Sequence, residues 1–313
     1  MGKPDTVTKD YMSRPDIFAD VFNQFLYHGE QVIQPERLTE LDTTEIVVPY
    51  GTDNASVPEQ RYRDAAKLLA AMTDGRAAYC ILAVENENKI NYAMPVKDGL
   101  YDFIQLARQV TETARSHRKS DNKDKKPSKD EFLSGFWKED RLLPVITLVV
   151  YYGADKWDGP QSLKEMYADC DESILKYAAD YRINLIAPYQ LSDEEIDEFH
   201  TNFREVMKYI KYSKDKKKLA EVISDDERFK NVERQALDVI NFTTGSKVKY
   251  SERKGAMDVC LAIQEMREES EIIGAIRFNR KRGISQDETK QYIMEEYQKD
   301  AKEADELIRT YWK

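Results

Sequence analysis

A continuous apolar run from Leu142 to Tyr152 (LLPVITLVVYY) constrains the fold of this chain more than any other segment. The run is rich in β-branched residues and ends at Gly153, so it predicts a strand. A strand without polar alternation is typical of the centre of a sheet that is covered on both faces. The chain has 313 residues, enough to bury this strand within one large domain or two smaller ones.

An Asp74-Gly75 dipeptide between two apolar segments is a signal for a two-residue hairpin turn. If this turn forms, the numbers of paired residues sum to 149, and Asp64 lies opposite Glu85. Opposed side chains have Cβ atoms ~4.5–5.5 Å apart, and Glu87 lies on the same face because strand side chains alternate. Carboxylates this close repel unless a proton or a cation lies between them. The three acids therefore predict a divalent-cation site.

The first half of this segment has a second interpretation. Arg63 to Met72 (RDAAKLLAAM) contains strong helix formers and no β-branched residue, so its propensity favours a helix at least as much as a strand. Ala77 to Val84 is a better strand candidate because it is short and contains Tyr, Ile and Val. In a helix the pairing argument has no meaning, and the local sequence leaves both interpretations open.

Helical and extended patterns alternate through the first 190 residues. The expected elements are a helix that begins near Pro15 and stops at Gly29, a strand at 44–50, the hairpin at 62–88, a helix from Pro95 to Arg118, the strand at 142–152, and a strand at 183–186. From Ser192, which forms a capping box with Glu195, the pattern is helical, with breaks near Ser224, Gly245 and Gly283.

The net charge of −10 argues against a nucleic-acid partner, since DNA-binding proteins usually carry a basic footprint. Positive charge is nevertheless concentrated in four runs, which are 115–129, 208–218, 247–254 and 277–282. Such runs are more often solvated surfaces than phosphate contacts. They would form a binding surface only if they shared one face of the folded protein.

The composition is that of a soluble, cytosol-type protein. Charged residues make up 34% of the chain, and no apolar run approaches the ~18–20 residues of a membrane span. The three cysteines (Cys80, Cys170 and Cys260) are far apart, which argues against a disulfide framework or a zinc site and for a reducing compartment.

Five short motifs follow one another in a recognisable order. They are Asp16-Ile17-Phe18-Ala19, Arg63-Asp64, the AVENE stretch from Ala83 to Glu87, Met94-Pro95-Val96-Lys97 with Tyr101, and Pro144 to Gly153 followed by Trp157. Over roughly residues 11–190, this order resembles the recombination-promoting nuclease, or YhgA-like transposase, branch of the PD-(D/E)XK nuclease superfamily. Each motif is nonspecific alone, and their order makes the resemblance fairly specific.

The resemblance implies an α/β fold. Its αβββαβ core, a mixed sheet flanked by helices, would occupy residues 1–190, with a flexible lysine-rich loop at 119–130. A helical C-terminal region would occupy 191–313. The implied activity is that of a metal-dependent DNA endonuclease of the recombination-promoting, transposase-like type. The expected partners are DNA and a second copy in a homodimer, without a membrane, and the expected location is the cytoplasm, in association with the nucleoid.

The resemblance also assigns roles to the acidic residues. Asp64 and Glu85 would bind Mg²⁺, for which Mn²⁺ could substitute, and the backbone carbonyl of Asn86 would complete the protein ligands. Glu87 would position or deprotonate the attacking water, or join a second metal ion. Asp16 would be an outer-shell acid.

Two departures from the family pattern concern the catalytic cation. Glu87 stands where the family has Gln and the superfamily has Lys, and Lys97 stands where the family has Arg. Lys97 and Tyr101 would face the scissile phosphate. Lys89 could supply a migrated cation, or be an ordinary exposed lysine at the end of a strand. The alternative function is therefore a catalytically degenerate DNA-binding or protein-interaction module on the same fold.

Overall fold

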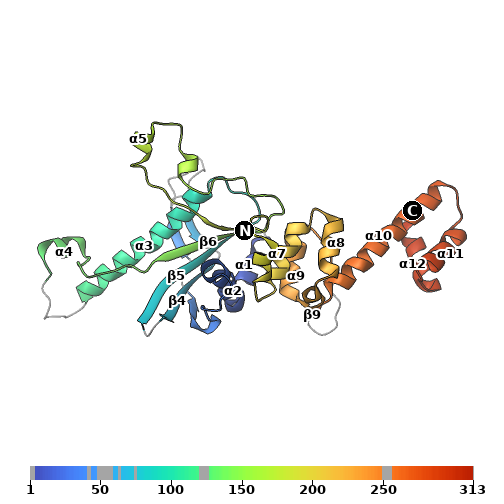
Figure 1. Cartoon of the computed structure of the whole chain (residues 1–313), viewed down its shortest axis with the longest axis horizontal. Helices are drawn as coiled ribbons and strands as arrows, with labels where there is room; N and C mark the ends of the chain where they lie inside the picture. Colours follow the sequence, from blue (N-terminus) through green and yellow to red (C-terminus); the bar gives the residue numbers. More distant parts are fainter. Residues whose placement is uncertain are drawn as a thin grey trace. The chain divides into compact units, whose positions relative to one another are not determined.

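The computed structural model describes residues 4–40, 44–47, 59–62, 65–73, 76–119, 127–248 and 256–312. It divides into two compact units, Met1–Lys214 with Asp238–Gly245, and Asp215–Leu237 with Ser246–Lys313. Figure 1 follows the chain through both units, which are described separately below. The expected functional division after residue 190 stays a prediction.

The first unit begins with two helices, α1 (Pro4–Ser13) and α2 (Pro15–Tyr27). Helix α2 starts at a proline, which suits the first turn because that turn needs no backbone N–H donor. It ends where His28 and Gly29 adopt left-handed φ angles of 51° and 85°. The predicted start and stop of this helix are thus confirmed, and its apolar residues Phe18 and Phe22 are fully buried.

A five-stranded sheet forms the centre of this unit. Its strands are β1 (Leu38–Glu40), β4 (Ala65–Thr73), β5 (Arg76–Glu87), β6 (Val145–Tyr151) and β7 (Asn184–Ile186), in the spatial order β1-β4-β5-β6-β7. The pairs β1–β4 and β4–β5 are antiparallel, whereas β5–β6 and β6–β7 are parallel. A separate pair consists of β2 (Thr44–Val47) and β3 (Glu59–Tyr62). The predicted α/β class and the mixed sheet are confirmed.

The hairpin interpretation of residues 62–88 is correct. Strands β4 and β5 pair from Thr73↔Arg76 to Ala65↔Val84, and every pair has numbers that sum to 149. The helix propensity of β4 is overridden because this strand also pairs with β1 on its other edge. Asp64, Asp74 and Gly75 lie outside the described residues.

Strand β6 is the buried central strand that its sequence predicts. It begins only at Val145, after Pro144, which has no N–H to donate but accepts a hydrogen bond from the Ile81 N–H at 2.9 Å. Its residues from Leu148 onward are buried. The crossover from β5 to β6 contains the 26-residue helix α3 (Met94–Lys119) and the short helix α4 (Lys129–Ser134), which Figure 1 shows beside the C-terminal end of α3.

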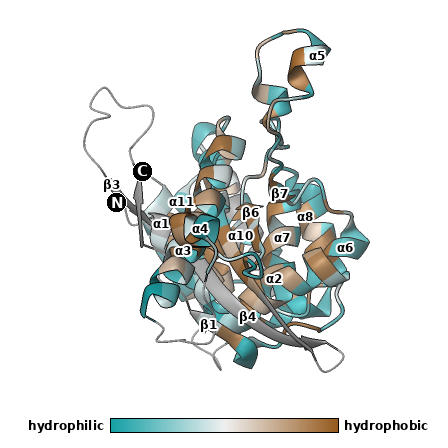
Figure 2. Cartoon of the chain, turned by 90° about the vertical axis from the view of Figure 1, so that its left-hand side faces the viewer, coloured by the Kyte–Doolittle hydropathy of each residue, from teal (hydrophilic) through white to brown (hydrophobic). Residues whose placement is uncertain are grey.

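The chain after β6 contains a protruding segment. It includes the 3₁₀ helix η2 (Lys164–Met166) and helix α5 (Glu172–Leu175), and it is closed at its base by a β-bridge between Ser162 and Arg182. Figure 2 shows hydrophobic residues on α5 at the end of this segment. Another 3₁₀ helix, η1 (Pro35–Arg37), precedes β1.

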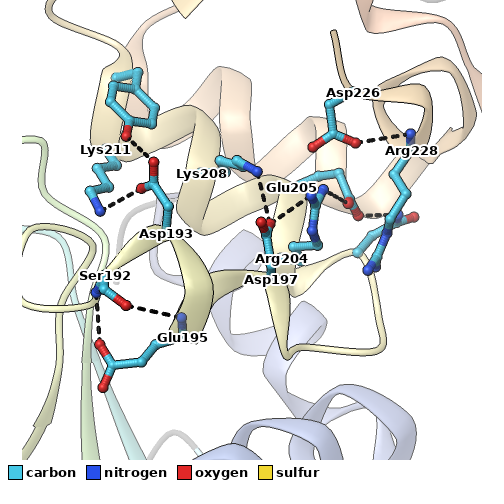
Figure 3. A network of polar contacts seen from close by, with 12 residues as sticks. Ser192, Asp193, Glu195, Asp197, Arg204, Glu205, Lys208, Lys211, Asp226 and Arg228 are labelled. Carbon is cyan, nitrogen blue, oxygen red and sulfur yellow. Dashed lines mark hydrogen bonds and ion pairs between the residues drawn. The ribbon is translucent and has the colours of Figure 1, made fainter. Parts of the chain in front are cut away.

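Helices α6 (Asp193–Asp197) and α7 (Phe203–Tyr212) are joined by a network of charges, shown in Figure 3. The capping box of Ser192 and Glu195 is present as predicted. Lys208 and Lys211, from one of the basic runs, pair with Asp197 at 2.8 Å and Asp193 at 2.7 Å. These two lysines therefore serve the fold, which weakens the case for a phosphate-binding role of that run.

The second unit is mainly helical. It contains α8 (Lys216–Ser224), η3 (Glu227–Asn231), β8 (Val232–Glu233), β9 (Ala256–Met257), α10 (Val259–Lys281), α11 (Gln286–Glu296) and α12 (Ala301–Tyr311), while α9 (Arg234–Thr244) starts in this unit and ends in the first. The predicted breaks near Ser224, Gly245 and Gly283 are confirmed. None of the described helices combines the length and apolarity that a membrane span requires.

Candidate functional site

Two of the predicted acids lie at the C-terminal end of β5. Glu85 is paired with Val149 of β6, and Glu87 with Tyr151, so both follow the buried core of a central strand. Only 2% of the Glu85 side chain and 15% of the Glu87 side chain are exposed. Side chains two apart on a strand share a face, so two carboxylates lie close together where little water can screen them.

A lysine from helix α3 balances these two acids. The Nζ of Lys97 lies 3.1 Å from Glu85 Oε2 and 2.7 Å from Glu87 Oε1. Burial lowers the pKa of Lys97, but attraction to both carboxylates outweighs burial and raises its pKa well above the ordinary value. Lys97 therefore stays charged, and its ammonium group lies between Glu85 and Glu87. The cation predicted between Asp64 and Glu85 stays a prediction, because Asp64 lies outside the described residues.

The local sequence explains why Lys97 reaches this place. The side chain of Asn91 accepts a hydrogen bond from the Ala93 N–H at 3.0 Å, and its carbonyl accepts one from Met94 at 3.1 Å. Pro95 then lies in the first turn of α3, where a missing N–H has no cost. Helix α3 therefore begins only seven residues after β5 ends, which brings its first turn next to the carboxylates.

The backbone of Asn86 faces away from β6. The Ile81 N–H bonds to the Pro144 carbonyl at 2.9 Å, and the Glu87 carbonyl accepts the Tyr152 N–H at 2.8 Å, so odd-numbered residues of β5 point their backbone groups at β6. Because these directions alternate along a strand, the Asn86 carbonyl points to the β4 side. The last described pair on that side is Ala65↔Val84. The predicted carbonyl ligand is thus directed at the edge on which the pairing rule places Asp64.

A second buried acidic group lies on α3, at Asp98, the residue after Lys97, and at Asp102, about one turn later. Asp98 and Asp102 both contact the Tyr181 hydroxyl, at 3.1 and 2.6 Å, and Asp102 also accepts a hydrogen bond from Thr147 of β6 at 2.6 Å. Burial, followed by the charges of the two aspartates, raises the pKa of Tyr181 far above its ordinary value. This network holds α3 against the sheet and so keeps Lys97 in place.

Sequence reasoning did not identify Asp98 and Asp102. Their spacing of four residues on the buried face of a helix was a usable signal, because carboxylates on an apolar stripe need partners. Tyr101, which was predicted to face a phosphate, lies in the same turn and is only 4% exposed.

The other predicted site residues lie at more open positions. Asp16 is 46% exposed and accepts hydrogen bonds from Arg14 at 3.1 and 2.5 Å; burial alone would raise its pKa, but Arg14 lowers the pKa overall. Lys89 is exposed. The buried acid of α2 is instead Asp20, which accepts bonds from the N–H groups of His200 and Thr201 at 3.0 and 2.8 Å. The catalytic role of Asp16 stays a prediction.

The described ranges contain no group of three or more His, Cys, Asp or Glu residues suited to a metal ion. Glu85 and Glu87 supply two carboxylates, and Asp64, the predicted third acid, lies outside those ranges. Mg²⁺ is commonly held by only one or two carboxylates together with water and substrate oxygens. The donor set at the end of β5 is therefore chemically suitable for Mg²⁺.

Comparison with known proteins identifies the family. No curated protein and no solved structure matches this chain. The family model described as "Putative transposase, YhgA-like" matches residues 69–236, more than half of the chain, and its span includes β5, α3 and β6. The resemblance noted in the sequence is thereby confirmed at the level of the family. The chain belongs to the YhgA-like transposase family.

Proposed function

We propose that this protein is a metal-dependent DNA endonuclease of the recombination-promoting type, built on a PD-(D/E)XK-like core. The family membership suggests a DNA-related role in transposition or recombination. The observation that carries the proposal is the pair of carboxylates, Glu85 and Glu87, held in a buried position by Lys97 at the end of a central strand. A buried acidic pair with a cation is costly to maintain, so it is a candidate for function.

The order of elements supports this assignment. Helix α2, the antiparallel strands β1, β4 and β5, helix α3 and the parallel strand β6 occur in the αβββαβ order, with the separate β2–β3 pair inserted between β1 and β4 and the short helix α4 between α3 and β6. The acids follow the middle strand of the sheet, and the C-terminal ends of strands are where α/β sheets commonly bind ligands.

In the proposed site, Mg²⁺ would be held by Asp64, Glu85 and the backbone carbonyl of Asn86, with Mn²⁺ able to substitute. The bound ion would supply a more acidic water and would neutralise charge on the phosphate. Glu87 would accept the proton of the attacking water as a general base. Lys97 would offer N–H donors to the oxygens of the scissile phosphate, to which it is electrostatically complementary.

The position of Lys97 bears on the two departures from the family pattern. The strand carries Glu87 where the superfamily has a lysine, but an ammonium group from α3 reaches Glu87 at 2.7 Å. A cation that is absent from the strand is thus supplied by the following helix. We therefore assign the role of migrated cation to Lys97, and Lys89 has no such contact among the described interactions.

The same observation also favours the second candidate, a degenerate DNA-binding module. Lys97 takes up one oxygen of each carboxylate, so a metal ion would have to compete with an ammonium that is already well bound. If Lys97 permanently takes the place of the metal ion, the protein would keep its fold and lose its nuclease activity.

Cleavage of supercoiled plasmid DNA in Mg²⁺ or Mn²⁺ tests the proposal. We expect nicking by the wild-type protein, and loss of nicking to the buffer background in Asp64→Ala and in Glu85→Ala. Glu172→Ala, which removes an exposed acid of α5, is the matched control and should retain full activity. Undiminished nicking in both Asp64→Ala and Glu85→Ala would end the proposal.

Titration with Mn²⁺ separates the two candidates. A catalytic site should bind Mn²⁺ in a manner that Glu85→Ala removes and Glu172→Ala preserves. A protein that binds DNA but shows no binding of Mn²⁺ and no nicking would be the degenerate module.

A further inference from the structure

Helix α4 presents two large apolar side chains to solvent. Phe132 is 75% exposed and Leu133 is 71% exposed, and they are adjacent in sequence. Adjacent exposed apolar side chains form a contiguous patch, and contiguous apolar patches rimmed by polar residues mark interaction sites.

The two side chains lie on a helix whose ends are fixed by hydrogen bonds. The Ser128 N–H donates to Glu131 Oε2 at 2.7 Å, the Lys138 N–H donates to Glu131 Oε1 at 3.1 Å, and Gly135 ends the helix with a left-handed φ of 71°. These bonds close the helix at both ends. Phe132 and Leu133 are therefore presented by an ordered turn.

Helix α4 is also fixed to the C-terminal end of α3. The Trp137 ring stacks on His117 at a centroid distance of 3.7 Å. Asp140 Oδ2 lies 2.8 Å from His117 Nε2 and accepts a hydrogen bond from the backbone N–H of Trp137 at 2.6 Å. Gly135 lies so close to α3 that an added Cβ would meet the Cβ of Ala114 at 2.8 Å. These contacts fix the position of Phe132 and Leu133 relative to α3.

The surroundings of the pair are basic, in a protein of net charge −10. Six exposed cations lie nearby in sequence, namely Arg115, Arg118, Lys119, Lys129, Lys138 and Arg141. The exposed acids of the described stretch within 115–141 are Asp130 and Glu139, because the carboxylates of Glu131 and Asp140 are turned to backbone N–H groups. An apolar tip with cations around it is complementary to stacked bases between phosphates.

Helix α5 provides a contrast within the same unit. Ile174 of α5 and Tyr177, two residues after this helix, are 62% and 84% exposed. Residues 164–182 carry five Asp or Glu against three Lys or Arg. This second apolar surface would repel DNA, so charge singles out α4 as the DNA-facing one.

We propose that Phe132 and Leu133 form an apolar wedge that enters between base pairs of duplex DNA. The proposal deepens the proposed function and rests on it, because it assumes that DNA is the substrate. The cations of the α4 region would contact the flanking phosphates, and the side chains would unstack one base step, as apolar wedges do in DNA-bending proteins.

The wedge and the candidate active site lie at opposite ends of α3. Lys97 is in the first turn, and Ala114, which supports α4, is 17 residues later, or about 26 Å along the helix axis. That length corresponds to about 8 base pairs of B-form DNA. DNA that runs along α3 would be distorted about 8 base pairs from the bond that is cut.

The test is DNA binding in EDTA, where metal-dependent cleavage cannot occur. Duplexes carry 2-aminopurine, whose fluorescence rises on unstacking, at one position that is moved stepwise along the strand. We expect the wild-type protein to raise the fluorescence at one step. Phe132→Ala/Leu133→Ala should lose this signal and bind at least about 10-fold more weakly, which corresponds to about 1.4 kcal/mol, because the stacked ring of Phe132 is lost.

The matched control is Ile174→Ala/Tyr177→Ala, which removes similar exposed apolar surface and should bind and unstack DNA like the wild type. Melting temperatures check folding, and the single variants Phe132→Ala and Leu133→Ala carry the test if the double variant melts early. The wedge is refuted if the α4 variant keeps the signal and the affinity, if the control loses as much, or if the α4 variant changes only the oligomeric mass.

Failure of the wedge and failure of the nuclease can be told apart. Plasmid nicking by a wild-type protein that raises no 2-aminopurine fluorescence would overturn the wedge alone. Unstacking without nicking would overturn the nuclease and leave the wedge standing.

Discussion

Replacing Lys97 with methionine removes the ammonium group that contacts both Glu85 and Glu87. Methionine keeps the length of the side chain and deletes its charge. Removal of one partner from a buried ion pair costs about 3–5 kcal/mol, because the remaining charge is left without compensation. Lys97 is 21% exposed, and we therefore expect the lower end, about 3 kcal/mol at pH 7 without metal. Since 1 kcal/mol shifts the melting temperature by about 2–4 °C, the shift should be about 6–12 °C.

The assay is thermal unfolding of the full chain in EDTA, followed by circular dichroism. Lys89→Met is the matched control, because Lys89 is exposed and follows Glu87 by two residues; its effect should stay within about 0.5 kcal/mol. The double variant Lys97→Met/Glu87→Gln should recover part of the loss, because one of the two like charges is gone. In buffer without EDTA, free Mn²⁺ at about 100 times its Kd should stabilise Lys97→Met by about 2.7 kcal/mol. A Lys97→Met protein as stable as Lys89→Met would refute the reasoning.

The same ion pair has a signature at alkaline pH. The pKa of Lys97 is raised in the folded state above its ordinary value of 10.5, so its contribution to stability is complete below that pH and falls as the pH rises above it. The difference in stability between wild type and Lys97→Met should therefore narrow above about pH 10.5, by about 1.4 kcal/mol per pH unit. A difference that widens with pH in urea titrations would contradict this assignment of charge.

Four further substitutions test the packing. Gly274→Ala in α10 should stabilise the protein by about 0.5–1 kcal/mol in urea unfolding, because an added Cβ meets nothing within 4 Å; Gly99→Ala should lack this gain, because its Cβ would lie 3.1 Å from the Tyr181 ring. Tyr181→Phe should cost about 1–3 kcal/mol by the same measurement, because Asp98 and Asp102 lose their shared hydroxyl; a neutral result would mean that water replaces it. Asp20→Ala should cost a similar amount, and an unchanged melting temperature would show that the N–H groups of His200 and Thr201 find other acceptors.

The hairpin shows what a sequence can and cannot specify. The propensity of Ala65–Thr73 favours a helix as much as a strand, and the turn arithmetic alone predicted the register. The strand forms because β1 and β5 pair with it on both edges, and pairing over such distances leaves no mark within the segment. Strand β6 was predictable for the opposite reason, since its own composition requires burial.

The sequence was sufficient to predict the acidic residues of the site, but not the residues that pair with them. Alternation along a strand placed Glu85 and Glu87 on one face from the sequence alone. The contacts of Lys97 with them depend on where α3 begins and how it docks, and Tyr181 joins Asp98 from 83 residues away. Interactions of this kind are set by the packing of whole elements, for which a single sequence offers no periodic signal.

The close approach of Gly135 to Ala114 has a consequence for which changes in sequence this protein can tolerate. Because α4 is fastened to α3 by its own contacts, the chain that joins Lys119 to Ser128 need not set the location of the helix tip. Residues could be added to or removed from that connection at a modest entropic cost, and the positions of Phe132 and Leu133 would not change. A larger residue at position 135 would instead clash with Ala114 and displace α4 from α3, even if the connecting chain were unchanged.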